Sequence, residues 1–202
     1  MKLYCATTNP GKLREFRLIV EHFGGERITV DTLPNIRDVE APEETGSTFE
    51  ENAALKAVYY SQFASGPLFA DDSGLAVDAL DGAPGVHSAR FAGEHAGDAA
   101  NNQLLLERLR GVHNRTARFV CVIALAEAGE VKGMWRGEVE GRIIDDNIDG
   151  QERGTEGFGY DPLFYFETFG ATFGQVPVEK KLLVSHRSKA LEAMIRALRL
   201  DS

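Results

Sequence analysis

The chain has 202 residues, of which 43% are hydrophobic and 26% are charged, so one domain spanning residues 1–202 can bury a substantial core. Its 31 acidic and 22 basic side chains give a formal net charge of −9 at pH 7. Such a surface repels the phosphate backbone of DNA or RNA, which argues against a nucleic acid polymer as partner, but it does not exclude a local basic pocket for one small anion.

Cysteine usage and hydropathy indicate a soluble, cytoplasmic protein. Cys5 and Cys121 both lie in apolar runs typical of strands, which favours buried free thiols over a disulfide. The first residues lack the long apolar segment of a signal peptide, and the longest apolar run, residues 119–126, is too short to span a bilayer. No membrane partner is therefore expected.

The first half of the chain alternates strands and helices. Residues 2–7 predict a short strand, and Asn9 and Pro10 suit the cap and the first position of the helix that follows. Thr48 and Glu51 form a capping box that predicts the start of a second helix, which should end near residue 65.

Strands cluster in the second half. Asp98 can cap a third helix, and residues 117–126 are apolar on both faces like a central strand. Residues 130–144, with Gly129 and Glu130 as a turn, suggest a hairpin followed by another strand. A glycine-rich loop spans about residues 150–160, and Ser185 can cap a last helix. This order predicts an α/β fold with a mixed sheet and helices on its faces.

Two adjacent carboxylates give the strongest chemical signal. Asp71 and Asp72 follow the apolar run 68–70, which resembles the end of a buried strand, and Ser73 and Gly74 come next. Mg²⁺ prefers one or two protein carboxylates together with waters and substrate phosphates. Because neighbouring side chains on a strand face opposite ways, we expect one acid to face a ligand and the other to face the protein. A turn with two exposed acids is the alternative.

A second candidate lies between the first strand and the first helix. It consists of Thr7, Thr8, Asn9, Pro10, Gly11 and Lys12. A polar turn before a capped helix directs backbone N–H groups and the helix dipole toward an anion such as phosphate, and the lysine adds positive charge. The segment is not a Walker loop. An ordinary strand-to-helix connection is the alternative.

Acids also precede the second helix. Glu43 and Glu44 could add a metal ligand to the two aspartates, but acids near a helix N-terminus are favourable without any ligand.

Two later segments carry groups that suit a nucleobase. The first contains Phe158, Gly159, Tyr160 and Asp161, and the second contains Lys180, Lys181, Ser185, His186 and Arg187. An aromatic ring on a loop can stack on a base, and cationic donors can bind a base carbonyl or a phosphate. A loop anchored to the core by its aromatic rings and a solvated basic patch are the alternatives.

Six segments in this order resemble the inosine triphosphate pyrophosphatase family, the dITP/XTP pyrophosphatases. The segments are Thr7-Thr8-Asn9-Pro10-Gly11-Lys12, Glu43-Glu44-Thr45-Gly46-Ser47-Thr48-Phe49, Glu51-Asn52-Ala53, Ala70-Asp71-Asp72-Ser73-Gly74-Leu75 through Ser88-Ala89-Arg90, Phe158-Gly159-Tyr160-Asp161 and Ser185-His186-Arg187. Each is weak alone, but six in order along nearly the whole chain are specific. The resemblance implies an elongated mixed sheet flanked by helices, two lobes around a central cleft, and a homodimer.

The resemblance also implies a reaction. It is the Mg²⁺-dependent hydrolysis of non-standard purine nucleoside triphosphates (ITP, dITP, XTP) to the monophosphate and pyrophosphate, which cleanses the nucleotide pool. By position, residues 7–12 would hold the phosphate tail. Glu43 and Asp72 would bind Mg²⁺, Asp72 would accept the proton of the attacking water, and Ser73 would touch substrate.

The same resemblance assigns the remaining positions to substrate binding. Residues 158–161 would hold the base, and Lys181, His186 and Arg187 would contact base or phosphate. Family members often carry an acid where Lys180 stands, so either lysine of that pair could be the one that contacts the ligand.

Three other functions compete with this one. A septum-inhibitor-type nucleotide pyrophosphatase would share the fold but act on modified or pyrimidine nucleotides, and residues 185–187 argue against it. A non-catalytic nucleotide-binding protein would not need Asp72 and Lys12. A structural dimer module would bind no nucleotide.

Overall fold

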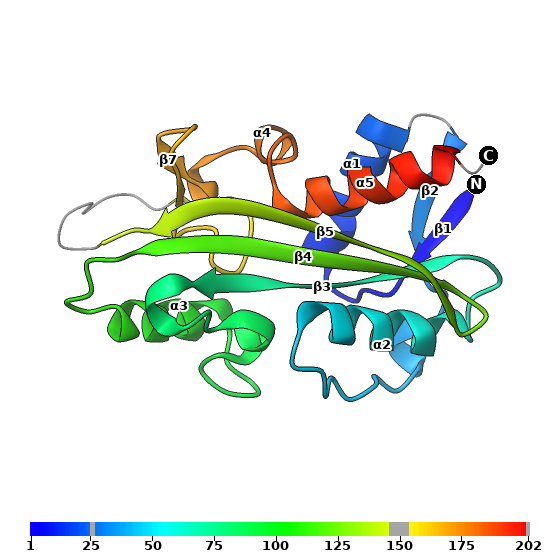
Figure 1. Ribbon diagram of the computed structural model, residues 1–202, viewed down its shortest axis with the longest axis horizontal. Coiled ribbons are helices and arrows are strands. Elements are labelled where there is room, and N and C mark those ends of the chain that lie inside the picture. Colours follow the sequence, from blue (N-terminus) through cyan, green and yellow to red (C-terminus); the bar gives the residue numbers. More distant parts are fainter. Residues whose placement is uncertain (25–26, 146–153, 201–202) are drawn as a thin grey trace. The chain divides into compact units, whose positions relative to one another are not determined.

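The computed structural model (Figure 1) describes residues 1–24, 27–145 and 154–200. Residues 150–153, with which the predicted glycine-rich loop begins, lie outside the described residues. The strands are β1 (Lys2–Cys5), β2 (Thr29–Thr32), β3 (Leu68–Val77), β4 (Thr116–Glu127), β5 (Glu130–Ile143), β6 (Phe164–Phe166) and β7 (Ala171–Thr172). The helices are α1 (Pro10–Gly24), α2 (Phe49–Ser61), α3 (Asp98–Arg108), α4 (Val178–Lys181) and α5 (His186–Leu200).

The seven strands form one mixed sheet in the order β2-β1-β3-β4-β5-β6-β7. β1 runs parallel to both β2 and β3, whereas β6 is antiparallel to both β5 and β7. The predicted α/β class with a mixed sheet and helices is therefore confirmed.

The chain divides into two compact units. Unit 1 comprises residues 1–72, 121–138 and 184–202, and unit 2 comprises residues 73–120 and 139–183. A single domain and a central cleft stay predictions.

The starts of α1 and α2 follow the sequence, whereas Asp98, predicted as a cap, is the first residue of α3 and Gly97 occupies the cap position. The Asn9 side chain accepts hydrogen bonds from the backbone N–H groups of Gly11 and Lys12, so α1 begins where the cap predicts. Thr48 and Glu51 form the reciprocal hydrogen bonds of a capping box. α2 ends at Ser61, before the predicted end near 65, because the following N–H groups bond to carbonyls three residues back and tighten the last turn.

Two strand predictions need correction. The predicted hairpin is present, with its turn one residue earlier, at Ala128 and Gly129, where φ is positive as a tight hairpin requires; the strand after the turn, β5, extends without a break to Ile143, so no separate strand follows within residues 130–143. β3 also continues past the acids to Val77. Asp71 and Asp72 therefore lie within β3, although just beyond Phe69, where its pairing with β1 ends.

Unit 1 is layered. α1 and α5 pack side by side on one face of its strands, and α2 covers the opposite face (Figure 1). Phe16 of α1 meets Phe69 of β3 edge to face, with ring centroids 5.2 Å apart. Apolar residues on both faces of the sheet are buried, and this positions the polar residues of β3 between two layers of helices.

Unit 2 has an aromatic core of its own. The Phe119 and Phe164 rings lie 4.5 Å apart, and the Phe164 and Phe173 rings lie 5.1 Å apart. Cys5 and Cys121, which both belong to unit 1, are buried free thiols, as predicted, and burial raises the pKa of Cys5 to about 12. Within residues 1–24, 27–145 and 154–200, no helix has the length and apolar character needed to cross a membrane.

Candidate active site

Two carboxylates are buried next to each other in β3. Asp71 is 4% exposed and Asp72 is 6% exposed. Their ion-pair partners come from helices on opposite faces of the sheet, as the alternation of side chains along a strand requires. The predicted division of the pair between two environments is therefore observed within unit 1, and the alternative of an exposed turn is excluded.

Asp71 faces α1. Its Oδ2 atom lies 2.8 Å from Lys12 Nζ. Burial alone would raise the pKa of Asp71, but Lys12, together with the charges of Arg187 and Lys56, lowers it to about 2. Asp71 is therefore a carboxylate at every physiological pH and serves to hold Lys12.

Asp72 faces α2 and has a different environment. Its Oδ1 atom lies 2.7 Å from Lys56 Nζ, and Lys56 also lies 3.0 Å from Glu44. Burial raises the pKa of Asp72, and Lys56 only partly opposes this because Glu44 and Asp71 add like charge. The Asp72 Oδ2 atom is buried and accepts no hydrogen bond from any residue that the structure describes.

Lys56 neutralises this acidic cluster. Burial opposes its charge, but Asp72, Asp71 and Glu44 outweigh burial and raise the pKa of Lys56 to about 12. The sequence prediction did not include Lys56 in the site. The sequence does carry a signal for it, because Lys56 follows Asn52 by one helical turn on α2.

The acids around Asp72 fit a divalent cation that keeps most of its waters. No three acidic, histidine or cysteine side chains cluster as a metal cage among the described residues. A hard cation that binds through one or two carboxylates and substrate phosphates needs no such cage. The unpaired Asp72 Oδ2 atom is a suitable oxygen, whereas Glu44 is engaged by Lys56 and Glu43 is exposed.

The loop from Thr7 to Lys12 is largely satisfied by its own hydrogen bonds. Asn9 N–H donates to Thr7 Oγ1, and the Asn9 side-chain oxygen accepts hydrogen bonds from the N–H groups of Gly11 and Lys12. An anion at this loop would therefore bind to side-chain donors more readily than to these backbone N–H groups.

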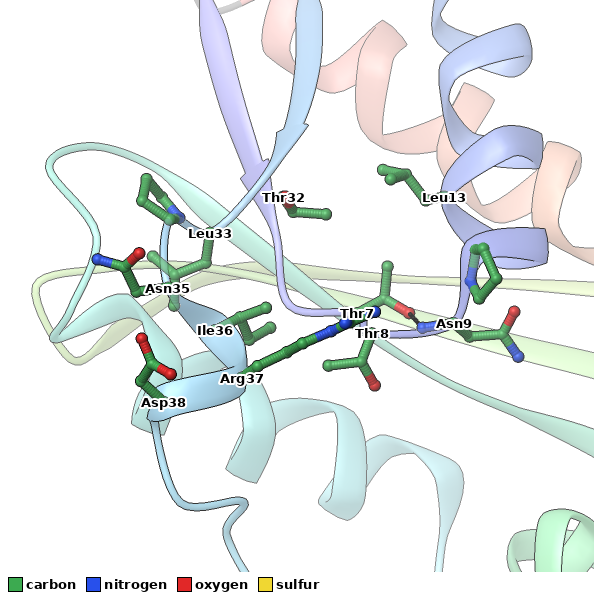
Figure 2. Close-up of a pocket in the computed structure, with 12 residues that line it drawn as sticks. Thr7, Thr8, Asn9, Leu13, Thr32, Leu33, Asn35, Ile36, Arg37 and Asp38 are labelled. Carbon is green, nitrogen blue, oxygen red and sulfur yellow. Dashed lines mark hydrogen bonds between the residues drawn. The ribbon is translucent and has the colours of Figure 1, made fainter.

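A cavity of about 480 Å³ lies beside this loop (Figure 2). Its walls are residues 7–10, Leu13 and residues 32–38, all in unit 1. The cavity thus lies beyond the carboxyl ends of the parallel strands β1 and β2, where ligands bind in open α/β sheets.

The α5 end of unit 1 holds two predicted base-binding residues. His186 and Arg187 are both buried in the first turn of α5. Arg187 lies 3.0 Å from Glu15 of α1, which is also buried. Sequence analysis missed Glu15 because the two residues are 172 positions apart and only the packing of α1 against α5 brings them together.

Unit 2 holds the predicted aromatic loop. Asp161 Oδ2 accepts hydrogen bonds from Phe158 N–H at 2.9 Å and from Lys181 Nζ at 2.7 Å. Lys181 also lies 5.4 Å from the centre of the Phe158 ring. Asp161 and Lys181 are buried, and the exposed Lys180 is not part of this group.

α3 clamps the same loop through a residue pair that the sequence did not single out. Asp98 accepts a hydrogen bond from Gly159 N–H at 2.7 Å, and Asn102 donates to Gly159 O at 3.1 Å. The Tyr160 hydroxyl donates to Ser88 O. Three hydrogen bonds therefore hold the loop segment next to Phe158 in place.

Ser73 and Gly74 continue β3 into unit 2. Gly74 is required by close packing, because a Cβ atom there would lie 2.3 Å from Ser88 Oγ and 2.4 Å from Gly85 O. The structure brings residues 7–12, 44, 71–72, 186 and 187 together in unit 1, and residues 158–161 and 181 together in unit 2. Their joint action on one nucleotide stays a prediction.

Comparisons with known proteins cover almost the whole chain. The Ham1 family profile matches residues 3–197. A Listeria monocytogenes protein named dITP/XTP pyrophosphatase is 48% identical over 199 residues, covering 98% of this chain and 94% of that protein. The solved Staphylococcus aureus Ham1 protein is 38% identical with a TM-score of 0.83 over 100% of both chains. The Coxiella burnetii HAM1 structure is 37% identical with a TM-score of 0.84 over 98% of both chains.

The Lys12–Asp71 pair makes a pH-dependent contribution to stability. An acid whose pKa is lower in the folded chain stabilises the fold above its ordinary value of 3.8, and that contribution is lost as pH falls toward about 2. Asp71→Asn should therefore lower the free energy of unfolding by about 2 kcal/mol at pH 7. Urea unfolding from pH 7 to pH 3 should show the difference from wild type shrinking below pH 4.

Asp31→Asn is the control, because Asp31 forms exposed ion pairs with Lys2 and Arg17. A constant difference between Asp71→Asn and wild type across this pH range would contradict the assignment.

The two adjacent lysines of α4 should differ sharply. Lys181→Ala leaves the buried Asp161 carboxylate without its cation and should cost roughly 3–5 kcal/mol of stability. Lys180→Ala removes an exposed charge and should change stability by less than about 0.5 kcal/mol. Chemical denaturation followed by circular dichroism measures both; equal losses would show that Lys181 does not hold the loop.

Proposed function

The chain belongs to the Ham1 family, and we propose that it hydrolyses the non-standard purine nucleoside triphosphates ITP, dITP and XTP to the monophosphate and pyrophosphate. The reaction would remove these nucleotides from the pool, in the cytoplasm, with the protein as a homodimer. The observation that carries the proposal is the environment of Asp72. It is a buried carboxylate of raised pKa, held through one oxygen by a lysine, and its other oxygen has no hydrogen-bond partner among the described residues.

Asp72 is the proton acceptor in this scheme. Lys56 fixes the Oδ1 atom, which leaves Oδ2 to orient a water molecule and take its proton. The water oxygen bonds to the α-phosphorus as the bond from that phosphorus to the bridging oxygen of the β-phosphate breaks. Pyrophosphate leaves with the bonding electrons.

Mg²⁺ is the cofactor that we propose, and its protein ligands would be Asp72 and Glu43. Glu43 is preferred to Glu44 because Lys56 already engages Glu44. When bound, the cation would neutralise phosphate charge and polarise the phosphorus that is attacked. Asp71, in contrast, holds Lys12 beside the loop of residues 7–12, where that lysine can meet a phosphate oxygen.

Base recognition would depend on stacking and on donors. Phe158 stands on a loop fixed by α3 and by Asp161, which suits a ring that must stack on a purine. Hypoxanthine and xanthine carry a carbonyl where adenine carries an amino group. Donors such as His186 and Arg187 would pair with that carbonyl and leave adenine mispaired. These base-binding roles, and that of Ser73, are inferred from the family resemblance.

Turnover with matched substrates tests the proposal. Pyrophosphate release should be fast with ITP, dITP and XTP, slow with ATP and GTP, and dependent on added Mg²⁺. Asp72→Asn should lower kcat by at least a factor of about 100, because it removes the general base. Asp31→Asn, an exposed acid of the same unit, should retain wild-type kcat.

Equal turnover of ITP and ATP would refute the base preference. Full activity of Asp72→Asn would refute the catalytic assignment.

A further inference from the structure

The cavity beside the loop of residues 7–10 contains an arginine that the proposed reaction has not used. Arg37 belongs to a short 3-10 helix, Ile36–Asp38, that follows β2. Figure 2 shows its side chain extending across the cavity toward Thr7 and Thr8. The Asp38 carboxylate lies on the other side of the segment, away from the two threonines, so it does not cancel the charge of Arg37 at that end of the cavity.

Arg37 differs from the cations near β3 because it has no carboxylate partner among the described residues. Lys12 pairs with Asp71, Lys56 pairs with Asp72 and Glu44, and Arg187 pairs with Glu15. Arg37 forms no ion pair with any residue that the structure describes. A polyanion that enters this region would find in Arg37 a positive charge that need not be taken from a carboxylate.

Hydroxyl groups complete the donor set. Thr7 Oγ1 accepts a hydrogen bond from Asn9 N–H, which leaves the hydroxyl hydrogen of Thr7 available to an acceptor in the cavity. The wall also includes the apolar side chains of Leu13, Leu33 and Ile36. A guanidinium and a hydroxyl against an apolar wall suit phosphate oxygens.

Strand order sets where along a triphosphate this cavity would fall. Thr32 of β2, Cys5 of β1 and Phe69 of β3 are in register across the sheet. The cavity lies beyond the ends of β1 and β2, whereas Asp72 lies on β3 on the far side of β1. Adjacent strands are about 4.8 Å apart, so β2 and β3 are roughly 10 Å apart. A tail attacked near Asp72 and directed toward β2 would reach the cavity with its far end.

We propose that this cavity receives the terminal phosphates of the substrate, the pyrophosphate that leaves, and that Arg37 binds them. The inference rests on the proposed function, since it takes the reaction to begin near Asp72. Negative charge increases on the leaving pyrophosphate as its bond to the α-phosphorus breaks. A guanidinium that binds two oxygens of the leaving group would stabilise that charge and fix the direction of the tail.

Binding of inorganic pyrophosphate and of dIMP separates this role from a general effect of charge. Isothermal titration calorimetry with Mg²⁺ and inorganic pyrophosphate should show at least a tenfold weaker affinity for Arg37→Ala than for wild type. Arg37→Lys should lie between them, because a lysine keeps the charge but loses the bidentate geometry. The affinity for dIMP, which lacks the terminal phosphates, should be the same in wild type and Arg37→Ala.

Arg14→Ala is the matched control. Arg14 is an exposed arginine of α1 that does not line the cavity, so its loss changes the net charge equally and should leave pyrophosphate affinity unchanged. The inference fails if Arg37→Ala binds pyrophosphate as wild type does, if Arg14→Ala weakens binding equally, or if wild type binds no pyrophosphate. Calorimetry needs no turnover, so these outcomes are distinct from a failure to hydrolyse dITP, which would refute the proposed function.

Discussion

A protein interior does not accept two adjacent carboxylates unless cations accompany them. In this chain, Asp71 and Asp72 are buried next to each other in β3, and each is joined to a lysine from a different helix. The requirement ties α1 and α2 to opposite faces of the same strand. It also makes the two acids unequal: Asp71 Oδ2 pairs with Lys12, whereas Asp72 Oδ2 accepts no hydrogen bond from any of the described residues.

The remaining charges follow from that arrangement. Lys56 forms ion pairs with both Asp72 and Glu44. Glu15 pairs with Arg187 on the face of the sheet where Asp71 and Lys12 lie. Most of the positive charge near β3 is therefore used to stabilise the fold. In the proposed reaction, a substrate with several phosphates would therefore require a divalent cation and a side chain outside these ion pairs, such as Arg37, because the net charge of the chain is −9.

Local sequence predicted what local interactions determine. The cap at Asn9, the capping box of Thr48 and Glu51 and the opposite orientations of Asp71 and Asp72 depend on neighbours in the chain, and all were anticipated. The partners of buried charges were not. The packing of distant elements decides that Lys181, not Lys180, pairs with Asp161, and that Glu15 pairs with Arg187. Residue spacing in the sequence does not contain that information. The continuation of β3 through the acids was missed because two aspartates disfavour a strand until lysines neutralise them.

The most direct test of this account is a carboxyl NMR titration of Asp71 and Asp72. We expect two well-separated steps, with Asp71 titrating near pH 2 and Asp72 titrating above its ordinary value of 3.8. Asp71→Asn and Asp72→Asn assign the steps. If both groups titrated together near 3.8, or if Asp72 were the more acidic, the two aspartates would not have the different environments on which the assignment of Asp72 as proton acceptor depends.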